Sequence, residues 1–196
     1  MKPYSEACDR NRDPILNVLK DSFTAPGTVL EIGSGTGQHA VYFARTLPHL
    51  QWIATDRDDN HSGIIAWMKE EGTSNLQGPL ILDVTNEQWP IEHADYVFSA
   101  NTAHIMSWPM VQKMFAGVGR VLSANGVFCL YGPFNRDGEF TSESNRHFDA
   151  ALKARDAHMG IRDDRELKAL GERCGLRFLA DHVMPANNRI LVWQRG

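Results

Sequence analysis

Hydrophobic residues along this chain form two kinds of segment: short continuous runs, and longer stretches in which they recur every three or four positions. The continuous runs predict strands over residues 28–32, 51–55, 79–84, 94–100 and 126–131. The helical spacing predicts helices over residues 12–24, 38–47, 60–71, 109–122, 144–157 and 164–174, the first with Pro14 in its opening turn. Because strands and helices alternate, we expect an α/β fold with a parallel sheet covered on both faces.

The last two predicted strands, residues 177–184 and 189–194, are joined by residues 185–188 alone. A crossover helix does not fit in this connection, so the two strands must pair antiparallel. We therefore expect a seven-stranded, mostly parallel sheet with an antiparallel last strand. Dinucleotide dehydrogenases usually end on a parallel strand, so this ending counts against them.

The chain has 196 residues, which suits a single domain over residues 1–196. Within it, we expect the helix over residues 12–24 to act as a cap and residues 135–174 to form a helical insertion over the site. The net charge of −4 and the pI near 6.0 create no field that attracts phosphate backbones. We therefore expect a small-molecule substrate and no nucleic-acid partner, while the sequence leaves the oligomeric state open.

The sequence carries no targeting or metal-binding signal. Without an apolar leader or a membrane-spanning stretch, we expect no membrane partner and a cytoplasmic location. Cys8, Cys129 and Cys174 are widely separated, which favours reduced thiols over disulfides or a thiolate metal site. The eight histidines include no close ligand pair with an accompanying acid, so we expect no metal.

A glycine turn follows the first predicted strand. Gly33, Gly35 and Gly37 alternate with Ser34 and Thr36 between this strand and the next helix. Glycine permits both a tight turn and the close approach of a ligand to the backbone. The spacing Gly-x-Gly-x-Gly differs from the Gly-x-Gly-x-x-Gly of dinucleotide folds, so no pyrophosphate seat is required.

Two acids stand at strand ends around this turn. Glu31 would repel a diphosphate but can pair, directly or through water, with the ammonium group of a methionine moiety; the alternative is an exposed strand-end carboxylate. Asp56 follows Gly37 by 19 residues, close to the spacing of an acid that accepts both ribose hydroxyls. A surface acid is the alternative for Asp56.

The ends of the later strands supply further candidates. Asp83 and Val84 can meet the adenine amino group and a ring nitrogen, with loop capping as the alternative for Asp83. Arg57 either lies along the adenine or is solvated. Asn101 is expected to orient its loop or offer its carbonyl, and His104 is the candidate base or substrate-orienting group. A loop histidine satisfied by backbone is the alternative for His104.

The run from Val29 to Gly37, with Asp56, Asp83 and residues 101–104, resembles class I S-adenosylmethionine-dependent methyltransferases over most of the chain. The resemblance implies their Rossmann-like fold with strand order 3-2-1-4-5-7-6, S-adenosylmethionine as cofactor and S-adenosylhomocysteine as product. A dedicated base is optional in methyl transfer, because alignment and exclusion of water are the main requirements. The cofactor-binding residues it implies are Glu31, Gly33, Ser34, Gly35, Gly37, Asp56, Arg57, Asp83, Val84 and Asn101.

Residues 8–16, residues 101–105 with Trp108, and residues 160–163 resemble more narrowly a family of uncharacterised proteins, the methyltransferase-like 26 or domain-of-unknown-function 938 group. This resemblance leaves the methyl acceptor open. Residues 10–12 form a polar cluster just before the apolar part of the first predicted helix. From this cluster we expect Arg12 to contact the methionine carboxylate, with solvation of the helix start as the alternative.

Taken together, these residues predict methyl transfer from S-adenosylmethionine to an unidentified, small-molecule acceptor. Two alternatives stay open. Asp56 would serve a ribose equally well in an NAD(P)-dependent oxidoreductase of Rossmann type. A non-catalytic S-adenosylmethionine-binding module that regulates a partner would use the same residues.

Overall fold

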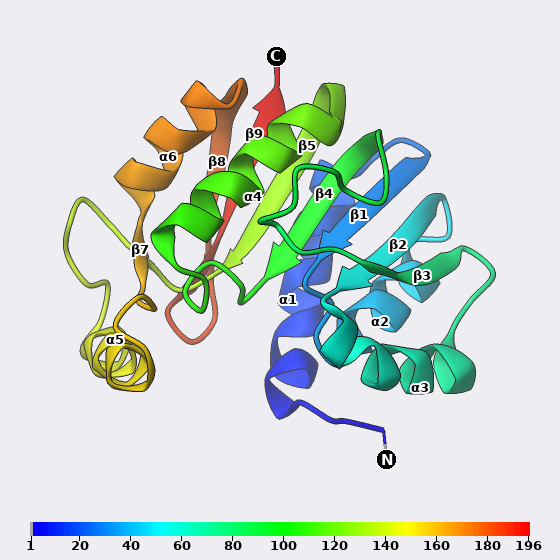
Figure 1. The fold of residues 1–196 in the computed structure, drawn as a ribbon, viewed down its shortest axis with the longest axis horizontal. Coiled ribbons are helices and arrows are strands. Elements are labelled where there is room, and N and C mark those ends of the chain that lie inside the picture. Colours follow the sequence, from blue (N-terminus) through cyan, green and yellow to red (C-terminus); the bar gives the residue numbers. More distant parts are fainter. Residues whose placement is uncertain (1) are drawn as a thin grey trace.

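The computed structural model describes residues 2–196 and contains a seven-stranded sheet in the order β3-β2-β1-β4-β5-β9-β8 (Figure 1). Its strands are β1 (Gly27–Ile32), β2 (Leu50–Asp56), β3 (Leu76–Ile81), β4 (Ala94–Ala100), β5 (Leu122–Gly132), β8 (Leu176–Met184) and β9 (Asn188–Arg195). β1 to β5 are parallel, and β9 pairs antiparallel with both β5 and β8. The expected fold class and the reversed last strand are therefore confirmed.

Numbered along the chain within this sheet, the strands follow the expected order 3-2-1-4-5-7-6. A second, two-stranded sheet was not expected. It consists of β6 (Phe134–Asn135) and β7 (Arg162–Asp163), which pair in parallel. This short pair joins the residues that precede and follow α5 in the segment between β5 and β8.

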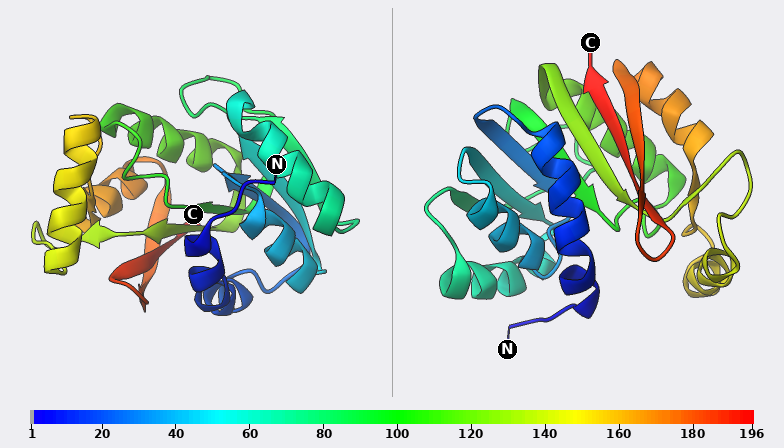
Figure 2. Two further views of the ribbon diagram at one scale, coloured as in Figure 1. Left: turned by 90° about the horizontal axis from the view of Figure 1, so that it is seen from below. Right: turned by 180° about the vertical axis from the view of Figure 1, so that it is seen from behind.

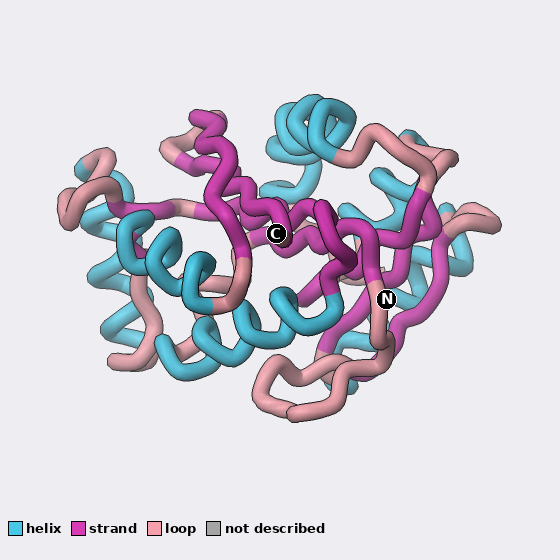
Figure 3. The backbone as a smooth tube through the Cα atoms, turned by 90° about the horizontal axis from the view of Figure 1, so that it is seen from above, coloured by secondary structure: helices cyan, strands magenta, loops and turns pink. Residues whose placement is uncertain are grey.

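The helices cover both faces of the main sheet (Figures 2 and 3). α1 (Glu6–Ser22), α2 (Gln38–Thr46) and α3 (His61–Glu71) lie on one face, and α4 (Trp108–Val121) and α6 (Asp164–Arg173) lie on the other. The 3-10 helix η1 (Asp58–Asn60) precedes α3. α5 (Glu143–Arg155) stands apart from both layers, at the lower left of Figure 1.

Each face of the sheet has its own apolar core. Toward α1 and α2, the ring of Phe43 lies 5.5 Å from that of Trp52 and 5.4 Å from that of Phe98. Toward α4 and α6, Phe128 stacks on Trp193 at 5.5 Å. All five side chains are fully buried. Strands buried on both faces read as continuous apolar runs, which is why the sequence located them.

Three elements begin or end more than two residues away from the prediction: α1, β3 and β5, of which β5 begins at Leu122 rather than at residue 126. The first helix begins at Glu6 rather than near residue 12, so Pro14 lies inside it and not in its first turn. The acids in its first turn, Glu6 and Asp9, favour this earlier start through the helix dipole. The third strand ends at Ile81, so residues 83 and 84 lie beyond it. Pro79 is tolerated inside this strand because β3 is at the edge of the sheet.

Candidate functional site

The carboxyl ends of β1, β2 and β4 border a cavity of about 480 Å³. This edge of a parallel sheet is where open α/β folds bind ligands. The sequence-predicted residues that line the cavity are Gly33, Ser34, Gly35, Asp56, Arg57, Asp83, Val84 and Asn101. Glu31, Gly37, Arg12 and His104 are not among its lining residues. The structure thus gathers most of the predicted set at one place.

The glycine turn packs closely against the protein at Gly33 and leaves open space at Gly35. Gly33 and Gly35 have φ values of 75° and 58°, in the left-handed region that favours glycine. A Cβ on Gly33 would lie 2.7 Å from Cγ2 of Thr102. A Cβ on Gly35 would meet no protein atom within 4 Å. Since Gly35 lines the cavity, the space beside it is available to a ligand.

Asp56 is fixed at the end of β2 by three hydrogen bonds. Its Oδ2 accepts the Gly35 N–H at 2.7 Å. Its Oδ1 accepts the Arg57 N–H at 2.7 Å and Asn60 Nδ2 at 2.9 Å. An ionised carboxylate offers about four acceptor positions, so Asp56 can still accept a hydroxyl from the cavity. The surface-acid alternative is wrong, because Asp56 is buried apart from the side that lines the cavity.

Glu31 lies beneath the glycine turn and is only 2% exposed, so the alternative of an exposed carboxylate is wrong. Its Oε2 accepts hydrogen bonds from Ser34 Oγ and from Trp52 Nε1, both at 2.9 Å. Burial raises the pKa of Glu31 to about 7, against the lowering effect of these two hydrogen bonds. Glu31 therefore holds Ser34 from below, and any ligand contact would pass through Ser34 or water.

Asp83 and Val84 form part of the cavity wall beyond β3. Asp83 Oδ1 accepts the Thr85 N–H at 2.8 Å and the Thr85 hydroxyl at 2.7 Å, and these bonds hold the pKa of Asp83 below its ordinary value. Asp83 therefore caps its loop through Oδ1, and its Oδ2 is left to accept a hydrogen bond from a ligand. Arg57 is exposed at the rim of the cavity and pairs there with Asp59 at 2.9 Å.

The loop after β4 is tied to the neighbouring strands. Asn101 adopts a φ of 59°, and its N–H donates to the Tyr131 carbonyl at 2.9 Å. The hydroxyls of Thr102 and Ser99 are 2.7 Å apart, and Ser99 Oγ donates to the Ile32 carbonyl at 2.7 Å. These bonds bring Asn101 and Thr102 to the cavity.

His104 lies on the same loop but its side chain does not line the cavity. Its buried ring packs edge-on against Phe148 at 5.3 Å. Burial, aided by the positive charge of Arg162, lowers the pKa of His104 to about 4. A histidine with so low a pKa is a weak general base at neutral pH. The base hypothesis for His104 stays a prediction, and the cavity geometry does not support it.

Arg12 also lies outside the lining, because residues 10–12 belong to α1 instead of preceding it. Arg12 pairs with Asp9 at 2.9 Å, and its guanidinium lies 4.7 Å from the ring centroid of Tyr42. It borders a second, smaller cavity between α1, α2 and α3.

Two further predicted parts of the site do not line the first cavity. Gly37 caps α2 rather than facing this cavity, and residues 135–174 contribute no lining residue to it. That segment contacts the loop after β4, and its expected place over the site stays a prediction.

Ser5, Cys8 and His39 line the cavity, although the sequence did not indicate them as site residues. The early start of α1 brings the first two there. His39 lies in the first turn of α2, with Nε2 2.7 Å from Asn11 Oδ1. Burial lowers the pKa of His39 to about 4, so the ring is neutral at neutral pH. Its place two residues after Gly37, at a helix start facing the ligand edge, is the signal that could have found it.

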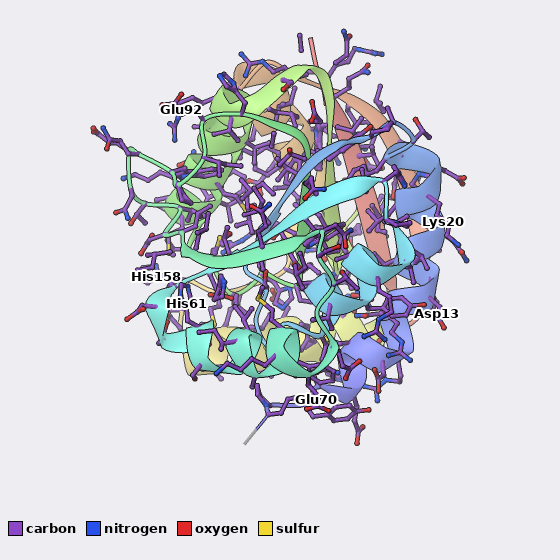
Figure 4. The ribbon with its side chains drawn as sticks, turned by 90° about the vertical axis from the view of Figure 1, so that its right-hand side faces the viewer. Asp13, Lys20, His61, Glu70, Glu92 and His158 are labelled. Carbon is purple, nitrogen blue, oxygen red and sulfur yellow. The ribbon has the colours of Figure 1, made fainter. Side chains whose placement is uncertain are left out.

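The N-terminal segment, residues 2–5, is fastened across α3 and α2. Lys2 Nζ pairs with Glu70 at 2.9 Å and lies 3.5 Å from the ring centroid of Trp67. Figure 4 labels Glu70 on α3, close to the start of the chain. The Ser5 N–H donates to Gln38 Oε1 at 2.6 Å, and Gln38 Nε2 donates back to the Ser5 carbonyl at 3.3 Å. These bonds hold Ser5 against the start of α2.

Charged side chains at the cavity are mostly acidic. Asp56, Asp59 and Asp83 line it together with a single guanidinium, that of Arg57. Arg57 already pairs with Asp59, and His39 is neutral. Such a lining attracts a cationic ligand and disfavours a diphosphate.

Among residues 2–196, no group of three His, Cys, Asp or Glu side chains is arranged to hold a metal ion. In the same part of the chain, every helix is too short or too polar to cross a bilayer. The expectations of a metal-free site and a cytoplasmic location stay predictions.

Residues 2–195 match the model of the family described as "Protein of unknown function (DUF938)". Because the match covers nearly the whole chain, the chain belongs to this family. The domain-of-unknown-function 938 resemblance is thereby confirmed, and the methyltransferase-like 26 name stays a prediction.

Several solved methyltransferase structures are similar in fold. An O-methyltransferase family protein from Burkholderia thailandensis gives a TM-score of 0.84 at 14% identity, over 97% of this chain and 58% of that one. The mitomycin 7-O-methyltransferase MmcR gives 0.83 at 16%, over 97% and 54%. CalO1, a methyltransferase in calicheamicin biosynthesis in its SAH-bound form, gives 0.76 at 20%, over 94% and 54%. This chain thus spans little more than half the length of these proteins, and the likeness is one of fold.

Proposed function

We propose that this DUF938-family protein is an S-adenosylmethionine-dependent methyltransferase that acts on a small-molecule acceptor. The observation that carries the proposal is the charge of the cavity lining. It contains three acidic residues, Asp56, Asp59 and Asp83, and one arginine, Arg57, which already pairs with Asp59. S-adenosylmethionine brings a sulfonium and an ammonium group, whereas NAD(P) brings a diphosphate. The lining therefore favours S-adenosylmethionine.

The start of α2 supports the same choice. A dinucleotide fold seats its pyrophosphate on free N–H groups at this helix N-terminus. Here the Gln38 N–H donates to Thr36 Oγ1 at 3.3 Å, and the Gln38 side chain binds Ser5. The Gln38 N–H and side chain are therefore already engaged and do not offer free donors to a pyrophosphate.

The lining fits the cofactor on two counts: the open space beside Gly35 and the spare acceptor capacity of Asp56. In this proposal Gly33 to Gly35 receive the methionine portion, Asp56 accepts a ribose hydroxyl, and Asp83 with Val84 meets the adenine edge. The bound cofactor supplies a methyl group activated by its positive sulfur. The protein's own task is to orient the acceptor and exclude water.

Calorimetric titration tests the cofactor choice. We expect binding of S-adenosylmethionine and S-adenosylhomocysteine, and none of NAD or NADP. Gly35→Ala places a methyl group in the cavity and should weaken S-adenosylhomocysteine binding at least about tenfold. Gly138→Ala is the matched control, because Gly138 also has a positive φ, 84°, and open space around it, but does not line the cavity.

Binding of NAD by the wild-type protein, without binding of S-adenosylhomocysteine, would establish the oxidoreductase alternative. Equal loss of affinity in Gly35→Ala and Gly138→Ala would contradict the placement of the cofactor at Gly35.

Transfer itself is tested with S-adenosylmethionine carrying a labelled methyl group, incubated with fractionated cell extract. We expect label in the small-molecule fraction and none in the nucleic-acid fraction. Tight cofactor binding without transfer to any fraction would favour the non-catalytic module.

A further inference from the structure

One wall of the cavity is a short loop, residues 101–106, of which Asn101, Thr102, Ile105 and Met106 line the cavity. The Ile105 and Met106 N–H groups both donate to the Thr102 carbonyl, at 3.1 and 3.2 Å. This turn leaves the carbonyls of residues 103, 104 and 106 without partners inside the loop. The loop therefore depends on donors from elsewhere to satisfy them.

Residues 158–162, on the far side of this loop, supply all of these donors. The Gly160 N–H donates to the His104 carbonyl at 3.0 Å. Arg162 Nε donates to the Ala103 carbonyl at 3.1 Å, and Arg162 Nη2 donates to the Met106 carbonyl. The same Nη2 also donates to the His158 carbonyl at 2.9 Å. One guanidinium thus joins both ends of the loop turn to the segment that follows α5.

Arg162 serves these carbonyls alone. Within residues 2–196, no carboxylate forms an ion pair with it, and it is only partly exposed. Burial lowers the pKa of Arg162, with Glu166 and Asp149 acting on it only through longer-range attraction. The planar fork of an arginine can bind two carbonyls at once, which the point charge of a lysine cannot reproduce.

We propose that Arg162 is a positioning residue for the cofactor cavity: it does not line the cavity, and it sets the place of Ile105 and Met106 through the backbone of residues 103–106. The inference rests on the proposed function for the identity of the ligand. It also gives the segment between α5 and α6 a role at the site, although that segment contributes no lining residue.

The test compares Arg162→Gln and Arg162→Lys with wild type by two measurements. Hydrogen exchange of the unliganded protein follows peptides covering residues 101–106, and calorimetry gives the affinity for S-adenosylhomocysteine. Arg165→Gln is the matched control, since Arg165 is an exposed arginine close by whose ion pair, with Asp137 at 3.0 Å, lies outside the loop.

In Arg162→Gln we expect faster exchange confined to residues 101–106 and affinity weakened about ten- to a hundredfold, as for loss of charge-assisted hydrogen bonds. Arg162→Lys should fall between this variant and wild type, and Arg165→Gln should match wild type. Unchanged affinity in Arg162→Gln, or faster exchange throughout the sheet, would overturn the inference. If wild type itself binds no S-adenosylhomocysteine, the proposed function fails, and unchanged loop exchange in Arg162→Gln would then overturn the inference separately.

Discussion

Glu31 is a buried acid whose environment decides its charge. Ser34 and Trp52 donate to a single oxygen of its carboxyl group, and no cation pairs with it among the described residues. Burial outweighs these two hydrogen bonds and raises its pKa to about 7. The folded protein therefore keeps a proton on Glu31 at pH values where the unfolded chain has lost it.

Glu31 therefore lowers the stability of the unliganded protein as the pH rises. Between its unfolded pKa of 4.5 and its folded pKa of about 7, the folded state binds more protons than the unfolded state, so stability falls as pH rises. Glu31→Gln keeps an oxygen acceptor and removes the ionisation. Relative to wild type, this variant should gain up to about 3 kcal/mol between pH 5 and pH 8 in urea unfolding. An identical pH dependence in both proteins would contradict the buried, protonated carboxyl.

The sequence predicted correctly the location of those site residues that are placed by the course of the backbone alone. Gly33, Gly35 and Asp56 are at the turn and the strand end that their spacing predicted, and all three line the cavity. His104 and Arg12 do not line it. Their orientation depends on packing against Phe148 and Tyr42, which are distant in sequence and carry no local signal.

α1 and α2 are joined by a polar seam as well as by their apolar faces. The Asn11 amide meets His39 at 2.7 Å, and the Tyr42 hydroxyl donates to Asp13. Asp13 lies on α1 at the right-hand edge of Figure 4. Asn11 and Asp13 therefore hold α1 to α2, the helix that follows the glycine turn.

Asn11→Ala tests this seam. It removes the partner of the buried His39 ring, and leaving that group unsatisfied should cost about 1 to 3 kcal/mol in urea unfolding. Asn17→Ala, an exposed position on the same helix, should change stability by less than about 0.5 kcal/mol. Similar losses in both variants would mean that the seam contributes nothing beyond helix propensity.

Helices and strands were predictable wherever the hydrophobic residues followed a single pattern, either a continuous run or a spacing of three to four residues. Of the elements whose boundaries were wrong, α1 and β3 were misplaced because of a proline. Pro14 was placed in a first turn, where its missing N–H costs least, but the acids at Glu6 and Asp9 start the helix earlier. Pro79 was taken as a strand start, but an edge strand accommodates it internally.

For the whole molecule, three buried groups together shape the dependence of stability on pH. His39 and His104 have pKa values near 4 in the folded state, lowered mainly by burial from 6.5. The unfolded chain therefore binds more protons at these histidines between pH 4 and 6.5, and stability rises with pH there. Glu31 acts in the opposite direction between pH 4.5 and about 7.

Two histidines outweigh one acid, so we expect the unfolding free energy to rise from about pH 4.5 to 6.5 and to decline slightly by about pH 7.5. Urea unfolding at half-unit pH steps measures this profile. A flat profile below pH 6.5 would show that the two histidines are not held neutral.

The fastening of residues 2–5 across α3 matters for how the protein is purified. An affinity tag fused ahead of Lys2 would join the chain three residues before Ser5, which lines the cavity. The chain ends after β9, and Figure 1 shows this end at the opposite side of the molecule from the start. A tag placed after Gly196 would leave the cavity free, so ligand screening should begin with that version of the protein.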